Sequence, residues 1–298
     1  MIMKPARIVV LGYEYFAKKI VSGLRLKGVE ARFLSRRFSL GDLLFLFRAD
    51  LIYCIGGRVS DWKLRIFQIS GKKIVMHWVG TDVEKFAREK PGTFTARCRH
   101  LTEDEQLREE LSQNGMRAEV CPIAAIEVPE NPPRFPAGKF AVLAYVPETR
   151  EEFYGRRIIE ALAETFSDIV FHICANTGKN WRKRPNVKFF GWVKNMSEQI
   201  RASHILIRPT RHDGVSFMVL EALAHGRYVI WSRPFPSCFL ATESEEFYEY
   251  VAHLFRRWKK GEMEINEAGR QYVKETFEPG RVYDGLIETL LEERNDRG

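Results

Sequence analysis

The chain has 298 residues, of which 45% are hydrophobic and 29% charged, and this composition excludes the disordered, collagenous and fibrous classes. Forty-seven lysines and arginines stand against 39 aspartates and glutamates, a net charge of +8 that favours anionic partners such as phosphates, acidic lipid surfaces or nucleic acid without choosing among them. No apolar run approaches the roughly 20 residues that span a bilayer, and no signal peptide precedes the first apolar run, so a cytoplasmic protein of two domains is expected.

The first half of the chain alternates strand-like and helix-like segments. Strands are predicted at residues 8–11, 30–34, 51–55 and 73–78, with a helix at 15–26, and this order is typical of βαβ units with a parallel sheet. A further helix is predicted over 102–114, with Thr102 as its N-cap, Glu105 as the capping-box partner and Gly115 as its stop, followed by a strand at 118–121. These elements predict an N-terminal Rossmann-like domain over residues 1–127.

A proline-rich segment over residues 128–138 predicts an extended linker. A second series then begins, with strands at 140–145, 169–174, 187–190 and 205–207 and helices at 155–165 and 197–202. These predict a second parallel-sheet domain over 139–280. Helices are also predicted at 243–259 and 281–293, and the segment 281–298 is expected to pack back on the first domain.

The most informative segment runs from residue 205 to 232 and reads as strand, glycine-containing loop, helix ended by Gly226, and strand. Loops that leave the carboxyl ends of parallel strands line the ligand crevice, and a helix N-terminus attracts anions. A phosphate is therefore predicted at Gly214, Val215, Ser216 and Phe217. Asp213 before the helix and Glu221 within it would bracket a sugar nucleotide.

Asp213 and Glu221 form an acid-x7-Glu pair, and in this setting the segment resembles the signature of the retaining glycosyltransferases of family 4, also called glycosyltransferase group 1. Asp213 stands where that family more often has Glu. The segments at 186–193 and 77–82 resemble other parts of the same family. The resemblance implies the GT-B fold, an α/β architecture of two Rossmann-like domains facing a cleft. It also implies a hexosyltransferase-type enzyme (EC 2.4 class) that moves a sugar from a nucleotide-diphospho-sugar donor to an unknown acceptor with retention.

The resemblance implies roles for particular residues. Glu221 would hold the ribose hydroxyls and Asp213 the sugar hydroxyls, while the amides from Gly214 to Phe217 would bind the diphosphate. The first domain would bind a glycan, lipid or small-molecule acceptor, with Gly12, Tyr13, Thr81 and Asp82 on that side. His77 would steer the acceptor hydroxyl or the donor sugar.

One departure from the family concerns the diphosphate. Family members usually have a lysine where this chain has Tyr154, so Arg208 or Arg156 is expected to supply the missing charge. Family members generally need no metal in the site, so the resemblance implies neither a metal nor a cofactor here. The sequence agrees, since no D-x-D-like pair ends a strand and no His/Asp/Glu cluster has metal-ligand spacing. The five cysteines are scattered and predict neither disulfides nor a zinc site.

Structural alternatives accompany these roles. The alternative role of Asp213 is a helix cap, that of Thr81 and Asp82 is an N-cap, and that of His77 is a hydrogen-bonded core histidine. The basic run around Trp181 is expected to be a charged loop that touches acidic lipid headgroups if the acceptor is a lipid, and nucleic acid is not an expected partner. Two rival functions stay open: a non-catalytic binder of nucleotide sugars or glycans, and a GT-B sugar-nucleotide epimerase.

Overall fold

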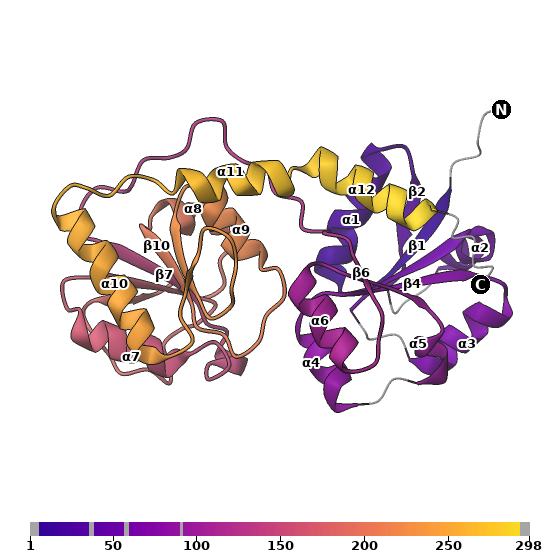
Figure 1. The fold of residues 1–298 in the computed structure, drawn as a ribbon, viewed down its shortest axis with the longest axis horizontal. Helices are drawn as coiled ribbons and strands as arrows, with labels where there is room; N and C mark the ends of the chain where they lie inside the picture. Colours follow the sequence, from indigo (N-terminus) through magenta and orange to yellow (C-terminus); the bar gives the residue numbers. More distant parts are fainter. Residues whose placement is uncertain (1–5, 36–38, 57–59, 90–91, 293–298) are drawn as a thin grey trace. The chain divides into compact units, whose positions relative to one another are not determined.

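The computed structural model describes residues 6–35, 39–56, 60–89 and 92–292. The chain divides into two compact units, one formed by Met1–Ala125 with Pro279–Gly298 and the other by Ile126–Glu278. Each unit contains one parallel six-stranded sheet with helices on both faces (Figure 1). The predicted α/β fold with two Rossmann-like sheets is therefore confirmed.

The sheet of the first unit has the order β2-β1-β3-β4-β5-β6. Its strands in chain order are β1 (Arg7–Gly12), β2 (Glu30–Phe33), β3 (Leu51–Ile55), β4 (Lys73–Trp78), β5 (Arg99–Thr102) and β6 (Glu119–Val120). Its helices are α1 (Glu14–Leu26), α2 (Leu40–Arg48), α3 (Asp61–Ile69), α4 (Thr81–Arg88), α5 (Thr93–Ala96), α6 (Glu105–Gln113) and α12 (Pro279–Leu291).

The sheet of the second unit has the order β12-β11-β10-β7-β8-β9. Its strands are β7 (Ala141–Tyr145), β8 (Val170–Cys174), β9 (Val187–Phe189), β10 (Ile205–Arg208), β11 (Tyr228–Trp231) and β12 (Phe239–Leu240). Its helices are η1 (Glu148–Arg150), α7 (Arg156–Thr165), α8 (Met196–Arg201), α9 (Phe217–Ala224), α10 (Ser244–Lys259) and α11 (Glu267–Thr276).

Alternating side chains of the buried strands supply two cores in the first unit. Ile52 and Cys54 of β3 pack on one side of the sheet with α2 and α3, whereas Tyr53 and Ile55 pack on the other side with α1 and α12. This period of two is what a parallel strand covered on both faces requires.

Helix α12 returns the end of the chain to the first unit, where it lies beside α1 (Figure 1). Leu286 of α12 joins the core that contains Leu24 of α1. A Cβ on Gly23 would fall 2.1 Å from the Tyr283 ring, so the two helices approach closely. The sequence predicts a helix over residues 281–293 within the final segment 281–298. Residues 293–298 lie outside those that the structure describes.

The predicted N-cap at Thr102 is wrong. Thr102 ends strand β5, which pairs with β4, and its buried hydroxyl donates to the Trp78 carbonyl at 3.3 Å. Asp104 is the N-cap of α6, since its carboxylate accepts from the Leu107 N–H at 3.0 Å. The backbone hydrogen bonds between β4 and β5 stabilise Thr102 in a strand more than the local capping pattern stabilises it as an N-cap. Strand β5 itself was not predicted.

The proline-rich segment has no regular element, as its composition predicts, and buried arginines of the second unit hold it in place. The Arg227 guanidinium donates to the Arg134 carbonyl at 3.1 Å and lies 5.0 Å from the Phe135 ring. The Arg270 guanidinium donates to the carbonyls of Pro129 and Glu130. Arg227 is completely enclosed, and burial lowers its pKa to about 10.

Candidate functional site

The candidate site of the second unit lies at the carboxyl ends of β7 and β10, which are neighbouring strands. Tyr145 ends β7 and Arg208 ends β10. The loop after β10 leads into α9, and the left-handed Gly155 before α7 packs against Pro209 of that loop, where a Cβ would fall 2.5 Å away. Two helix N-termini therefore begin at this edge of the sheet, as in sheets that bind ligands at their carboxyl edge.

Arg208 and Asp213 form an ion pair within this loop, between Arg208 Nε and Asp213 Oδ2. Their side chains are only 10% and 16% exposed. Burial by itself would lower the pKa of Arg208, but the charge and hydrogen bond of Asp213 outweigh it, and the pKa is raised. Asp213 is not the N-cap of α9; that position is Ser216, whose side chain makes no cap hydrogen bond.

Tyr154, at the position of the family's lysine, belongs to an aromatic cluster. Its ring lies 5.9 Å from Tyr145 and 5.3 Å from Phe153, and the Arg208 guanidinium lies 5.5 Å from its centre. Arg150 stacks 3.8 Å over Phe153. Burial raises the pKa of Tyr145, so this hydroxyl is protonated at neutral pH. Two guanidinium groups therefore stand beside the ring that replaces the lysine.

Arg156 opens α7 and already has carboxylate partners. It pairs with Glu151 at 2.9 Å, Glu160 at 3.4 Å and Glu152 at 3.8 Å. Buried Glu151 also accepts hydrogen bonds from the Asn176 amide at 2.8 Å and the Trp181 indole at 3.0 Å. Burial would raise the pKa of Glu151, but these hydrogen bonds together lower it. Sequence reasoning missed this organising carboxylate, whose partners are distant in the chain.

The predicted donor residues 214–217 and Glu221 lie in the loop before α9 and in the first five residues of that helix. Gly214, Val215 and Ser216 are buried, whereas Phe217 and Glu221 are only partly buried and lie four residues apart on one helix face. The other six residues of α9 are buried. The face with Phe217 and Glu221 is thus the part of the helix that a ligand can contact.

His77 lies in β4 of the first unit and is buried, with its Nδ1 2.6 Å from the Tyr53 hydroxyl. Its Nε2 makes no hydrogen bond within the described residues. Burial lowers the pKa of His77 to about 3, so the ring is neutral at pH 7. This arrangement is also that of a hydrogen-bonded core histidine, and the predicted steering role stays a prediction.

The other first-unit residues shape two loops at the carboxyl edge of that sheet. The Asp82 carboxylate accepts from the Val79 N–H at 3.0 and 3.2 Å and so closes the loop between β4 and α4, where Gly80, not Thr81, is the N-cap. Gly12 has φ +115°, and a Cβ there would fall 1.9 Å from the Ile55 carbonyl oxygen.

Tyr13 follows Gly12 and fills the space at the carboxyl end of β3, the neighbour of β1 in the sheet. Its N–H donates to the Ile55 carbonyl at 3.3 Å, and its ring covers Gly56, where a Cβ would fall 2.0 Å from the Tyr13 ring. Gly12, Tyr13 and Gly56 therefore make one close-packed turn, and the predicted acceptor role of Gly12 and Tyr13 stays a prediction.

Neither a metal cluster nor a membrane span is found in the part of the chain that the structure describes. No three His, Cys, Asp or Glu side chains there are grouped to hold a metal ion. No helix among the same residues has the length and hydropathy needed to cross a membrane.

Comparisons with known proteins bear on the second unit and on the fold. Residues 141–248 match the family model described as "Glycosyl transferases group 1". No curated protein matches the chain in sequence.

Solved structures with the same fold are numerous. HepE of Anabaena, solved in complex with UDP-glucose, is similar with a TM-score of 0.70 and 13% identity over 95% of this chain and 99% of that one. Sucrose-phosphate synthase of Thermosynechococcus elongatus has a TM-score of 0.74 and 10% identity over 95% and 98%. A glycosyltransferase of Rickettsia africae has a TM-score of 0.68 and 11% identity over 96% and 98%. The family model confirms the resemblance stated from the sequence over residues 141–248, and the solved structures confirm the GT-B fold.

Proposed function

We propose that this chain, whose second unit matches the group 1 glycosyltransferases and whose two units have the GT-B fold, transfers a sugar from a nucleotide-diphospho-sugar to an acceptor hydroxyl with retention. The acceptor is a glycan, a lipid or a small molecule, and the transferred sugar is a hexose. The observation that carries the proposal is the Arg208–Asp213 pair in the loop that leads to the partly exposed face of α9, all within the matched residues 141–248.

The donor would lie along this edge of the second sheet. Glu221 would accept hydrogen bonds from the ribose hydroxyls, and Asp213 would accept them from the sugar. The amides from Gly214 to Phe217, at the positive end of α9, would bind the diphosphate. The solved complex of HepE with UDP-glucose supports a nucleotide sugar as the donor, although the identity of 13% limits that likeness to the fold.

Arg208 would replace the family's lysine. Its guanidinium stands beside both Tyr154 and Asp213, so it can donate to a phosphate oxygen while Asp213 turns to the sugar hydroxyls. Stabilising the leaving diphosphate in this way lowers the barrier to breaking the glycosidic bond. Arg156 has three carboxylate partners and would contribute less.

The first unit would supply the acceptor side through Gly12, Tyr13, Thr81 and Asp82. His77 would act as a neutral hydrogen-bonding group, since a ring with a pKa of about 3 carries no charge at pH 7. In this proposal the chain works in the cytoplasm without a metal or a cofactor.

The test is the thermal stability of the protein with UDP-, GDP-, ADP- and CMP-sugars. A ligand at 100 times its Kd adds about 2.7 kcal/mol to the free energy of unfolding. We expect one nucleotide class to raise the wild-type midpoint and to leave Glu221→Ala unchanged. Glu249→Ala, at an exposed position of α10, is the matched control and should respond like wild type. A Glu221→Ala protein that responds fully would remove the donor site from α9.

A non-catalytic binder is the second candidate, and Tyr154 in place of lysine favours it. Release of nucleoside diphosphate over a long incubation separates the two, because a binder keeps the thermal shift without turnover. An epimerase would need further carboxylates as acid and base. Glu151, the buried carboxylate near Tyr154 in sequence, is instead occupied by Asn176, Trp181 and Arg156.

A further inference from the structure

A cavity of about 1240 Å³ lies at the opposite edge of the first sheet from the loops discussed above. Leu51, Lys73, Arg99 and Glu119 line it, and they are the first residues of the four neighbouring strands β3, β4, β5 and β6. The cavity is therefore at the amino ends of these strands. Gly12 and the residues after β4 are at the carboxyl ends, so the cavity is separate from the proposed acceptor side.

The walls of the cavity carry an excess of positive charge. Lys72, Lys73, Arg97 and Arg117 line it, and none of them has a carboxylate partner among the described residues. Lys72 donates instead to the carbonyls of Phe47 and Ala49, which leaves its charge uncompensated.

The carboxylates of the lining are already engaged. Glu119 and Glu292 lie 2.8 and 3.6 Å from the same guanidinium, that of Arg99. Arg108, a sixth cation of the lining, pairs with Glu105. The described lining residues thus include four cations without a carboxylate partner and no free acid, a balance that favours an anion.

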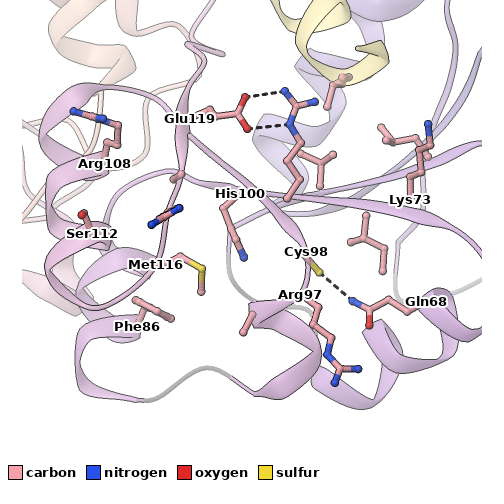
Figure 2. A pocket seen from close by; sticks show the side chains of 18 of the residues that line it. Gln68, Lys73, Phe86, Arg97, Cys98, His100, Arg108, Ser112, Met116 and Glu119 are labelled. Atoms are coloured by element: carbon pink, nitrogen blue, oxygen red, sulfur yellow. Dashed lines mark hydrogen bonds and ion pairs between the residues drawn. The ribbon is translucent and has the colours of Figure 1, made fainter. Parts of the chain in front are cut away.

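His100 supplies a buried donor in the middle of this lining. Its ring reaches between Met116 and Cys98 (Figure 2) and is only 4% exposed. The Trp78 indole N–H, which can only donate, lies 3.1 Å from His100 Nδ1, so Nδ1 is the acceptor and the proton of the neutral ring is on Nε2. Within the described residues that Nε2–H has no acceptor at full hydrogen-bond geometry, and the Thr95 carbonyl interacts with the ring more weakly than burial affects it.

The neutral state of His100 follows from its surroundings. Burial lowers its pKa to about 4, although the Thr95 carbonyl acts in the opposite direction. A buried donor that lacks an acceptor in good geometry costs free energy, and a ligand oxygen would reduce that cost.

We propose that this cavity binds a ligand through phosphate groups, with Lys73, Arg97 and Arg117 as the charged contacts and the His100 Nε2–H as a buried donor. The same chemistry belongs to a free phosphorylated metabolite and to a phospholipid headgroup. A lipid source is considered because two apolar side chains next to lining residues in the fold or the sequence are exposed. Phe47, whose carbonyl accepts from the lining residue Lys72, is 69% exposed, and Ile69, the last residue of α3 and the neighbour of the lining residue Gln68, is 73% exposed. The site does not depend on the proposed transfer reaction.

The experiment uses the full chain and hydrogen–deuterium exchange with inorganic pyrophosphate as the probe. We expect slower exchange in peptides covering residues 95–119, which contain β5 and α6. The Lys73→Gln/Arg97→Gln variant should lose this protection and weaken pyrophosphate binding at this cavity by about tenfold or more. The Arg256→Gln/Lys260→Gln variant removes two exposed charges from the second unit and is the matched control. It should keep both the protection of residues 95–119 and the wild-type affinity for pyrophosphate.

A second arm identifies the source of the phosphate. Cosedimentation with phosphatidylcholine vesicles, with and without phosphatidylglycerol, is measured for the same three proteins. Protection by pyrophosphate without vesicle binding supports a free metabolite, and phosphatidylglycerol-dependent binding that Lys73→Gln/Arg97→Gln abolishes supports a lipid headgroup. The proposal is overturned if neither probe acts on residues 95–119, or if the cavity variant behaves like wild type. Pyrophosphate that protects only residues 208–221 would report the donor site and would also overturn it.

Discussion

Arg208 pairs with Asp213, five residues further along the chain, and the two side chains are almost enclosed at the carboxyl edge of the second sheet. The same guanidinium stands over the Tyr154 ring. One arginine thus connects the acid expected to hold the sugar with the aromatic residue that replaces the family's lysine. Its removal should affect both stability and donor binding.

Substitution of Arg208 by Met should destabilise the protein by about 3 kcal/mol, because it leaves Asp213 with an uncompensated charge in a nearly enclosed position. Urea unfolding followed by circular dichroism measures this. Arg208→Met/Asp213→Leu should recover most of the loss, since neither charge then remains. If the single variant is as stable as wild type, the ion pair contributes nothing to the fold.

The stability of the first unit should fall as the pH is lowered, partly because of His77. The pKa of its imidazole is about 3 in the folded state, whereas the ordinary value, which applies to the unfolded state, is 6.5. Between pH 3 and pH 6.5 the unfolded state therefore binds a proton that the folded state does not bind. The folded state is thus favoured above pH 6.5 and loses that advantage as the pH falls towards 3. Between pH 7 and 5 this histidine accounts for about 2 kcal/mol.

His77→Phe is the variant that measures this contribution, since it cannot titrate. Its unfolding free energy should fall less between pH 7 and 5 than that of wild type, whatever its absolute stability. His253→Phe, at an exposed position of α10, serves as the control and should keep the wild-type slope. Equal slopes for wild type and His77→Phe would contradict the neutral buried state.

Gly12→Ala should destabilise the protein by about 3 kcal/mol, because the new Cβ meets the Ile55 carbonyl and the backbone is in a conformation that favours glycine. Gly285→Ala is the opposite case, since this α12 position has open space and an ordinary helical backbone. It should stabilise by about 1 kcal/mol through helix propensity. In thermal denaturation, Gly12→Ala should have a lower midpoint than wild type and Gly285→Ala a higher one.

Glu151→Gln should cost about 2 kcal/mol, because the amide cannot accept from Arg156, Asn176 and Trp181 as a carboxylate does. Its neighbour Glu152 is half-exposed, and Glu152→Gln should change stability by less than about 0.5 kcal/mol. Urea unfolding of the two variants distinguishes the buried carboxylate from the surface one. Similar losses for both would show that burial of Glu151 does not matter.

Most strands and the two-sheet architecture could be predicted from the sequence, because a buried parallel strand reads as a short apolar run between turn residues. The order of elements around β10 and α9 was predicted for the same reason. Strand β5 was missed since Arg99 and His100 are polar in type, and only pairing with β4 shows that this segment is a strand.

The candidate site could be predicted in part. Asp213, Glu221 and Arg208 are close in sequence, so a local pattern indicates them together. Their pairing was missed, because a sequence does not tell whether Arg208 faces a ligand or Asp213. The bond between His77 and Tyr53, and the cavity around His100, depend on the register of strands that are separated by whole helices.

Helix α12 makes the first unit discontinuous in sequence, whereas the second unit is one continuous stretch whose ends meet: the Ile126 N–H donates to the Phe277 carbonyl at 2.8 Å. The second unit can therefore be excised as residues 126–278. The first unit requires a splice from Ala125 to Pro279, because a fragment that stops before α12 would leave Ile20 and Leu24 uncovered. Donor affinity can then be assigned to one polypeptide segment, with every acceptor-side residue physically removed.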